Sequence, residues 1–383
     1  MMITKRLLDV CDFQGGTQPP KEEWINDPRE GYVRMLQIRD YSQGDAKFIQ
    51  YVKDTKKLHK CKKDDIMLSR YGYIGQAFMG LEGAYNVALV KVIKKEEIHT
   101  PYLLYYFKSY YFQHFLLSNV GARATIPGFN KDELENALIR LPEMREQVEI
   151  ASKIAKVDEL IGYHKQQLDI LDTLIKSRFI ELFGDPVTNE KNWARLTLGD
   201  ICEIGSSKRV FEKDYVPKGV PFFRTKEIVE LSKGNPISTE LFINEEHFEK
   251  LRKIYGAPKK DDLLISAVGT IGTIWIVSGD FEFYFKDGNL IQIKSSPSFN
   301  SIFMKYLLDE LIANYKKEMS TGTAYSALTI AGLKKMLVYD VPLFLQTKFA
   351  TFVEQTDKSK LAIQQSLEQL ETLKKSLMQQ YFG

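Results

Sequence analysis

Two similar stretches, each long enough for a helix of about five heptads, constrain the fold of this chain more than any other feature. The first runs from Glu146 to Phe183 and contains no proline. Its apolar residues recur in alternating steps of three and four, with interruptions at His164 and Arg178. This spacing predicts a coiled-coil helix rather than a globular surface helix, nearly 60 Å long at about 1.5 Å per residue. The seam comprises Ile150, Ile154, Val157, Ile161, Leu168, Leu171, Ile175 and Leu182.

The C-terminus repeats this stretch after a shift of 199 residues (350 − 151). Ala151 then aligns with Ala350, and Phe183 with Phe382. We expect the two helices to pair with each other, and the alternative is that they belong to unrelated bundles. The second seam contains three polar members and comprises Phe349, Val353, Thr356, Lys360, Ile363, Leu367, Leu370, Lys374, Leu377 and Tyr381.

The duplication extends beyond the helices. Leu7–Phe13 aligns with Leu198–Ile204, and each segment is followed by a small polar loop. The sharpest match is between Lys62–Gly75 and Lys259–Gly272, which share a charged turn, three apolar residues, a serine and a glycine-bearing turn. This order predicts a β-hairpin in each half. Its glycines are equally compatible with close approach to a ligand and with ordinary turn chemistry.

Further elements recur in the same order in both halves. A strand-like run ending in a basic residue precedes each hairpin, and a strand, an aromatic-rich helix and a second glycine loop follow it. Packing is the default role for these aromatics, with base stacking as the alternative. A short helix and a strand then lead into the long helix. The runs are Val33–Arg39, Val87–Ile93, Thr100–Asn119 and 121–129 in the first half, and Val220–Lys226, Asn289–Ile293, Phe303–Lys317 and 321–328 in the second.

These patterns predict an α+β protein with two tandem repeated domains of mixed sheet and helices. The domains are separated and joined by the two long helices. The predicted boundaries are 1–145 for the first domain, 146–184 for the central helix, 185–190 for a linker, 191–342 for the second domain and 343–383 for the last helix.

Composition places few limits on function. The 383 residues carry a net charge of only +3, which neither demands nor excludes nucleic acid as a partner. No apolar run is long enough to span a membrane and the start lacks a signal peptide, so we expect a cytoplasmic protein without a membrane partner. The cysteines show no metal or disulfide spacing, and Cys11 and Cys202 occupy matching repeat positions, where buried packing is the expected role.

The sequence lacks the motifs of several enzyme classes. It contains no G-x-x-x-x-G-K-[ST] phosphate loop, no G-x-G-x-x-G after a strand, no amino-methyltransferase motif and no His-Glu-x-x-His pair. No catalytic, cofactor-binding or metal-binding residues can therefore be assigned. A duplicated chain of this kind, built on a long helical spacer, predicts a binding protein with two heads.

The duplicated motifs resemble those of the specificity subunit of bacterial type I restriction–modification enzymes. The resemblance covers essentially the whole chain. Two departures are Tyr73, where the family usually has threonine, and the absence of arginine from the second glycine loop of the C-terminal half. The motifs that carry the resemblance are Asp64-Asp65 and Asp261-Asp262, the Ser-x-x-Gly-x-Ile-Gly segments at 69–75 and 266–272, the Leu-Pro and Val-Pro pairs before the helices, Phe-Gly-Asp at 183–185 and Tyr-Phe-Gly at 381–383.

The resemblance implies a sequence-specific DNA-binding subunit that is not itself an enzyme. Each domain would read one half of a bipartite target in double-stranded DNA. The helices would form an antiparallel coiled coil that separates the domains, sets the spacer and docks two methyltransferase subunits. Those subunits would carry S-adenosylmethionine and methylate adenine. Two restriction subunits would add DNA translocation and cleavage with ATP and magnesium.

Candidate DNA-binding residues come from the loops that the duplication places at equivalent edges. Arginine paired with guanine, and asparagine or glutamine paired with adenine, are the commonest direct readers of base edges. For each single position the alternative is a solvated loop residue. The candidates are Gln18, Arg39, Arg70, Tyr71, Arg123 and Thr125 in the first half, and Ser207, Lys208, Arg209, Arg224, Lys226, Thr270, Thr323 and Tyr325 in the second.

Two other functions compete with DNA recognition. A non-catalytic coiled-coil adaptor, whose two heads bind protein partners, would fit the near-neutral charge. A stand-alone DNA-cleaving enzyme is disfavoured because metal-binding carboxylates cannot be placed.

Overall fold

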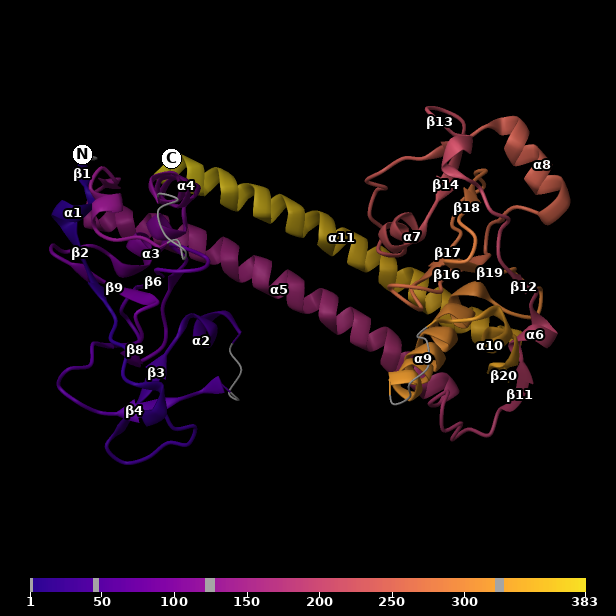
Figure 1. The fold of residues 1–383 in the computed structure, drawn as a ribbon, viewed down its shortest axis with the longest axis horizontal. Helices are drawn as coiled ribbons and strands as arrows, with labels where there is room; N and C mark the ends of the chain where they lie inside the picture. The colour runs from indigo at the N-terminus through magenta and orange to yellow at the C-terminus, as the bar shows by residue number, and fades with distance from the viewer. Residues whose placement is uncertain (1–2, 44–47, 121–127, 321–326) are drawn as a thin grey trace. The chain divides into compact units, whose positions relative to one another are not determined.

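The computed structural model describes residues 3–43, 48–120, 128–320 and 327–383, apart from the side chains of 318–320, and it divides into two compact units (Figure 1). Unit 1 consists of Met1–Gln166 and Gln364–Gly383, and unit 2 of Gln167–Ile363. The division falls within both long helices. Each unit therefore contains one globular head and about half of each helix.

The two long helices are present as predicted. Helix α5 spans Met144–Phe183 and α11 spans Leu343–Phe382. The residues of both predicted seams are buried or half-buried, whereas most positions between them are exposed. The three-and-four spacing therefore marks the packed face of each helix, as expected for coiled-coil periodicity.

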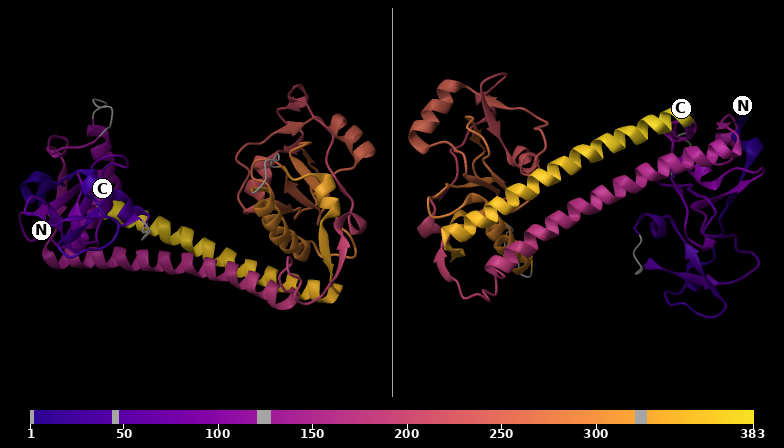
Figure 2. Two further views of the ribbon diagram at one scale, coloured as in Figure 1. Left: turned by 60° about the horizontal axis from the view of Figure 1, so that its bottom comes forward. Right: turned by 180° about the vertical axis from the view of Figure 1, so that it is seen from behind.

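In unit 1 the first half of α5 runs antiparallel to the last half of α11 (Figure 2). Lys374 Nζ lies 2.5 Å from Asp158 Oδ1, and His164 Nε2 lies 2.9 Å from the hydroxyl of Ser366. Residue numbers rise along one helix as they fall along the other, which defines the antiparallel direction. Two interruptions of the apolar seams, His164 and Lys374, thus have polar partners on the facing helix.

In unit 2 the remaining halves of the helices also pair in the antiparallel direction. Lys360 Nζ lies 2.6 Å from Asp172 Oδ1, and the rings of Phe179 and Phe349 meet edge to face with centroids 5.4 Å apart. The polar seam residue Lys360 is again matched by a carboxylate on the other helix. The prediction that the two helices pair with each other is thereby confirmed within each unit.

The described residues of the unit 1 head form three sheets. One is antiparallel with strand order β2-β9-β6-β7, and a second, of order β4-β3-β8-β5, contains a parallel pair between β3 and β8. The third pairs β1 with β10, the strand that leads into α5. The bounds are β1 Ile3–Arg6, β2 Cys11–Gly15, β3 Tyr32–Leu36, β4 Tyr51–Lys53, β5 Lys60–Cys61, β6 Met67–Ser69, β7 Ala77–Phe78, β8 Gly83–Tyr85, β9 Leu89–Lys94 and β10 Leu138–Leu141, with helices α1 Leu7–Val10, α2 Ile38–Ser42, α3 Thr100–Lys108 and α4 Tyr110–Asn119.

Unit 2 repeats this arrangement with changes at the sheet edges. Its antiparallel sheet has the order β12-β19-β16-β17, its second sheet the order β13-β15-β14-β18, and β11 pairs with β20. The parallel pair of the second sheet is now β14 with β18. The bounds are β11 Ala194–Thr197, β12 Ile204–Gly205, β13 Tyr215–Val216, β14 Val220–Phe223, β15 Phe242–Ile243, β16 Leu263–Ser266, β17 Ile274–Ile276, β18 Tyr284–Phe285, β19 Leu290–Ile293 and β20 Leu337–Asp340, with helices α6 Leu198–Ile201, α7 Thr225–Ser232, α8 Glu245–Tyr255, α9 Ser301–Ser320 and α10 Ile330–Lys335.

One predicted helix is interrupted. The aromatic-rich stretch of unit 1 breaks at Ser109, whose backbone is extended and whose hydroxyl accepts the Phe112 N–H at 3.2 Å. Ser109 therefore caps α4 and ends α3, because serine competes for backbone hydrogen bonds at helix starts. The equivalent helix of unit 2, α9, is continuous. The aromatics of α3 and α4 are largely buried in the core of unit 1, so packing is their main role.

The three cysteines are buried as free thiols. Burial raises the pKa of the Cys11 thiol to about 12 and that of Cys202 to about 11. Such thiols behave as small apolar residues, which confirms the packing role predicted for Cys11 and Cys202. Among the described helices none has the length and apolar character needed to cross a bilayer.

Candidate nucleic-acid interface

The duplicated aspartates close the charged turn that precedes each hairpin. Asp65 Oδ2 accepts the N–H of Lys62 at 2.8 Å, and Asp262 Oδ2 accepts the N–H of Lys259 at 2.9 Å. Asp262 is buried, and its second oxygen accepts the N–H of Ser295 at 2.8 Å. Hydrogen bonds of this kind stabilise a turn, so the aspartate part of the motif is structural.

The duplicated serines hold the next turn in shape. Ser69 is buried, and its hydroxyl donates to the carbonyl of Tyr73 while accepting the N–H of Gln76 at 2.9 Å. Ser266 makes the corresponding pair of bonds in unit 2. One small hydroxyl thus bridges both sides of the turn, which explains why the repeat places serine at the end of the first hairpin strand.

The glycines of the motif make the turn protrude. Gly72 and Gly75 have φ values of +73° and +78°, and Gly269 and Gly272 have +75° and +79°. These conformations are readily adopted only by glycine. The side chain of Tyr73 stands at the tip of the first turn and is 78% exposed. The common motif is therefore a scaffold, and the residues at the tip differ between the units.

Arg70 is the centre of a cluster in unit 1 that joins three segments. Its Nε donates to the carbonyl of Phe129 at 3.1 Å, and its Nη2 donates to the Asn130 side chain. The guanidinium carbon lies 5.2 Å from the centroid of the Tyr71 ring. A Cβ added to Gly15 would lie 3.8 Å from Arg70 Nη1. The structure therefore brings together the end of β2, the hairpin turn and the residues Phe129 and Asn130 at the end of the second glycine loop.

The other two described candidates of unit 1 differ in their surroundings. Gln18 is exposed in the loop after β2, as expected for a residue that meets a ligand. Arg39 does not end a strand, because β3 ends at Leu36 and Arg39 lies within α2. Its Nη2 donates to Gln50 Oε1 at 2.7 Å, and its guanidinium carbon lies 5.3 Å from the Phe48 ring centroid. The prediction for the position of Arg39 was wrong, since the extended run is followed at once by a capped helix.

In unit 2 the loop after β12 is hydrogen-bonded to strand β18. The hydroxyl of Ser207 donates to the carbonyl of Phe285 at 2.6 Å, and the N–H of Lys208 donates to the hydroxyl of Tyr284 at 3.0 Å. These bonds fix the backbone and leave the Lys208 side chain exposed. The loop is thus held rigidly while its cationic side chains extend outward.

Two exposed aromatics beside this loop were missed in the sequence. Phe211 is 54% exposed, and Arg209 and Lys213 lie 6.0 Å and 5.8 Å from its ring centroid. Tyr255, at the end of α8, has the Lys208 ammonium 5.5 Å from its ring centroid. Cations over exposed rings suit a nucleic acid, which offers phosphates and π-faces together. The signal that identifies this patch is an aromatic residue flanked by two cations within two positions on either side.

The side chains of Arg224 and Lys226 interact with neighbouring residues of unit 2. Arg224 Nη2 lies 2.8 Å from Glu227 Oε1, and that carboxylate is in a residue only 1% exposed. The hydrogen bond with Glu227 raises the pKa of the Arg224 guanidinium. Lys226 lies in α7 and donates to Thr239 Oγ1 at 2.8 Å. As with Arg39, the expected strand ends earlier, at Phe223, so the prediction that Lys226 ends a strand was wrong.

The remaining candidates divide into two groups. Thr270 stands in the protruding turn of unit 2, at the position that Tyr73 occupies in unit 1, and is exposed. Arg123, Thr125, Thr323 and Tyr325 lie outside the described residues. Among the described residues there is no group of three or more His, Cys, Asp or Glu side chains placed to hold a metal ion.

The chain is similar in fold to solved specificity subunits. It aligns over 100% of its length with 96% of the S subunit of a type I restriction–modification system from M. genitalium, with a TM-score of 0.59 and 17% sequence identity. It also aligns over its full length with 97% of a chain from a study of type I R-M complex assembly, with a TM-score of 0.56 and 16% identity. At this identity the likeness concerns the fold.

Sequence comparison identifies relatives and a family. The chain is 27% identical over 226 residues to the type I restriction enzyme MjaVIII specificity subunit and 26% identical over 265 residues to the MjaIX specificity subunit, both from Methanocaldococcus jannaschii. These alignments cover 59% and 63% of this chain, and 52% and 60% of those proteins. The family model for the type I restriction modification DNA specificity domain matches twice, at residues 2–172 and 190–372. The chain therefore belongs to the type I restriction–modification DNA specificity family and contains two copies of its domain.

Proposed function

We propose that this chain is the non-catalytic DNA-recognition subunit of a type I restriction–modification complex. Each head reads one half of a bipartite target in double-stranded DNA. The paired stretches of α5 and α11 set the unread spacer between the half-sites and dock two methyltransferase subunits.

The observation that carries this proposal is the duplicated protruding turn. Both units use the same Asp, Ser and Gly residues to build it, yet they place different side chains at its tip. Tyr73 and Thr270 stand at equivalent positions, and Arg70 of unit 1 is matched by Ala267 in unit 2. Two recognition modules for different base sequences require a constant scaffold with variable tips. The scaffold positions the module on the DNA, and the side chains at the tip contact the bases and determine the sequence that is read.

The partners supply the chemistry in this proposal. The methyltransferase subunits would bind S-adenosylmethionine and transfer a methyl group to adenine. Two restriction subunits, where the system contains them, would use ATP and magnesium to translocate and cut DNA. The purified chain alone should therefore have no methyltransferase, nuclease or ATPase activity. Turnover by the chain free of partner subunits would contradict this assignment.

The test is a domain exchange followed by mapping of methylated adenines. The full chain is expressed with its methyltransferase partner, and residues 191–342 are replaced by the equivalent segment of a relative. One half-site should change, and the half-site read by residues 1–145 should stay the same. The reciprocal exchange of residues 1–145 serves as the matched control. Alteration of both half-sites by one exchange would overturn the assignment of one half-site to each head.

The alternative function is a coiled-coil adaptor whose heads bind proteins. The cation-covered aromatics Phe211 and Tyr255 favour DNA, because a polyanion with stacked bases satisfies both parts of that patch. In an adaptor, neither exchange would alter the methylation pattern.

A further inference from the structure

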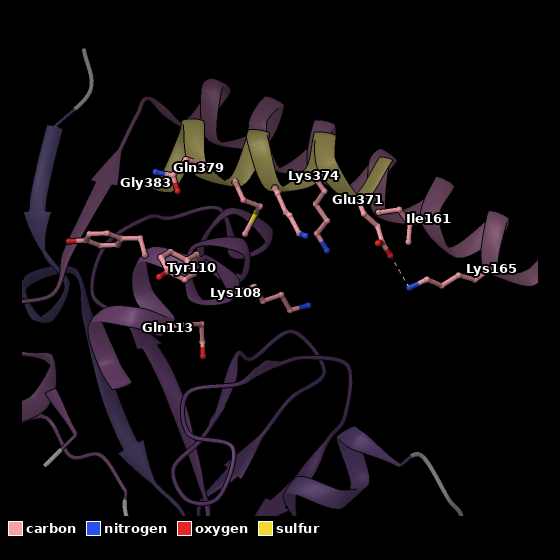
Figure 3. Close-up of a pocket in the computed structure, with 12 residues that line it drawn as sticks. Lys108, Tyr110, Gln113, Ile161, Lys165, Glu371, Lys374, Gln379 and Gly383 are labelled. Carbon is pink, nitrogen blue, oxygen red and sulfur yellow. Dashed lines mark ion pairs between the residues drawn. The ribbon is translucent and has the colours of Figure 1, made fainter. Parts of the chain in front are cut away.

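A lysine-lined cavity of about 800 Å³ lies in unit 1, between helices α3 and α4 and the paired stretches of α5 and α11 (Figure 3). Its walls include apolar and aromatic side chains such as Ile161, Met378 and Tyr111. Four lysines also line it: Lys108, Lys165, Lys374 and Lys375. The cavity is thus an apolar hollow with a cationic rim.

Two of the four lysines form no ion pair within the described part of the chain. Lys165 Nζ lies 3.5 Å from Glu371 Oε1, and Lys374 forms the ion pair with Asp158 described above. Lys108 and Lys375 make no ion pair or hydrogen bond with any residue that the structure describes. Figure 3 shows the ammonium groups of Lys108 and Lys374 extending into the same space. The cavity therefore holds an excess of positive charge.

The surroundings of Lys108 make this excess unfavourable in the free protein. Desolvation lowers the pKa of its ammonium, Asp158 opposes that change, and Lys374 lowers the pKa further. Like charges close together in a partly dry site repel one another. An anion bound between them would relieve this repulsion, so the geometry favours occupation by a negatively charged group.

The second copy of the fold replaces two of these four lysines, Lys108 and Lys374. Gln147 Oε1 accepts the N–H of His99, and Gln346 Oε1 accepts the N–H of Asn300 in the same way. His99 and Asn300 are therefore equivalent positions. Nine residues further on, the position of Lys108 in unit 1 corresponds to Asp309 in unit 2. Asp309 is paired with Lys305 at 2.8 Å.

The helix register extends the contrast between the copies. Under the 199-residue shift, Lys374 corresponds to Ile175, a buried core residue of unit 2. The positions of Lys108 and Lys374 are therefore non-cationic in unit 2, whereas Lys375 aligns with Lys176. The fold itself does not require a cation at the first two positions.

The cavity adjoins the protruding turn of the same unit. Gln113, one of its lining residues, donates from Nε2 to the carbonyl of Gly75 at 2.6 Å. Gly75 ends the turn that carries Arg70, Tyr71 and Tyr73. The turn and the cavity are therefore neighbours within unit 1.

We propose that this cavity binds phosphate groups of the DNA backbone beside the half-site read by unit 1. The inference rests on the proposed function and deepens it. Lysine ammonium groups suit phosphates because they act as mobile point charges without the bidentate fork that reads a base. The cavity therefore contributes affinity that is independent of sequence.

The test uses the full chain in complex with its methyltransferase subunits. The double variant Lys108→Gln/Lys375→Gln removes the two cations that form no ion pair and leaves the pairs of Lys165 and Lys374 in place. Its affinity for a fluorescent duplex of about 40 base pairs is measured from about 50 to 200 mM KCl. The slope of log K against log salt should fall by about 2, and binding should weaken roughly tenfold. The loss should be equal for target and unrelated duplexes.

The matched control is Lys156→Gln/Lys358→Gln. It removes the same charge from two exposed lysines of α5 and α11 that do not line the cavity. The double variant Lys108→Arg/Lys375→Arg retains both charges and should restore the slope, and a thermal melt of each variant checks its folding.

Three results would overturn the inference, and they are distinguishable. If the wild-type complex binds no duplex, the proposed function fails together with it. If DNA binds but the cavity variant matches the control, only the phosphate site is wrong. If the cavity variant instead loses its methyltransferase subunits on gel filtration, the cavity binds an acidic protein segment.

Discussion

Two arginines of this chain illustrate how residues of one type differ in role. The guanidinium of Arg70 donates hydrogen bonds to the Phe129 carbonyl and the Asn130 side chain and lies near the Tyr71 ring, beside an exposed turn. Arg224 instead neutralises the buried carboxylate of Glu227. Because an unpaired buried charge is costly, the Arg224–Glu227 pair contributes to the stability of unit 2.

Arg224→Ala should therefore act on stability. It removes the side-chain partner of Glu227 but leaves the hydrogen bond from the residue 224 N–H, 2.7 Å from Glu227 Oε2. We expect the free energy of unfolding of unit 2 to fall by about 1–3 kcal/mol. Urea unfolding measures the change, and Lys226→Ala, which loses only an exposed bond to Thr239, is the control. Equal stability of the two variants would show that Glu227 does not depend on Arg224.

Phe211→Ala should act on DNA binding alone. More than half of the side chain is exposed, so its removal costs little packing. If a base stacks on the ring, the variant should lose about 1–3 kcal/mol of binding free energy. Ile254→Ala is the control, because Ile254 is an exposed apolar residue of α8 in the same unit. Competition binding of the intact complex compares the two, and equal affinities would exclude stacking on Phe211.

At the scale of elements, each long helix begins at one head and ends in the core of the other unit. The end of α5 places Phe183 against Phe303 with ring centroids 4.7 Å apart, and the end of α11 places Phe382 against Tyr102 at 5.1 Å. The repeated Phe-Gly sequence that ends each helix thus has a packing role. It completes the core of a unit with a residue distant in sequence.

Phe382→Ala should destabilise unit 1 specifically. Phe382 is 4% exposed and belongs to the main core of that unit. Truncation of a buried phenylalanine costs about 3–5 kcal/mol through lost burial and the cavity left behind. Leu373→Ala, at an exposed position of the same helix, should change stability little. Hydrogen exchange of α3 and α4 compared with that of unit 2 localises the loss; uniform loss in both units would contradict a local role.

At the scale of the molecule, the proposed function makes helix length the determinant of the DNA spacer. Four residues inserted between Gln167 and Thr173 lengthen a helix by at most about 6 Å. This corresponds to up to roughly two base pairs of DNA. Such an insertion is a stutter, which unwinds a coiled coil locally without destroying it. We expect a longer unread spacer between unchanged half-sites.

Mapping of methylated adenines checks this expectation. A substitution of the same region that keeps its length, such as Gln167→Ala with Thr173→Ala, is the control. An unchanged spacer with full activity would show that the helices do not set the distance. Changed bases within a half-site would instead show that the helix contributes to reading.

Local and repeated features of the fold can be predicted from the order of the residues. The seams of α5 and α11, both hairpins and the buried positions of Cys11 and Cys202 follow from periodicity and repetition. These signals depend on neighbours a few residues away, or on a second copy that can be aligned. The sequence by itself therefore determined the duplicated α+β fold, the helix pairing and the family.

Only the tertiary structure decided which polar side chains are free to meet a ligand. Arg224 is paired with the buried carboxylate of Glu227, and Arg39 lies in a helix and donates to Gln50. Lys108 and Lys375 are far apart in sequence and line one cavity only because the last half of α11 packs in unit 1. The availability of a charge depends on what lies around it in space, and that arrangement is set by contacts between segments that no local pattern records.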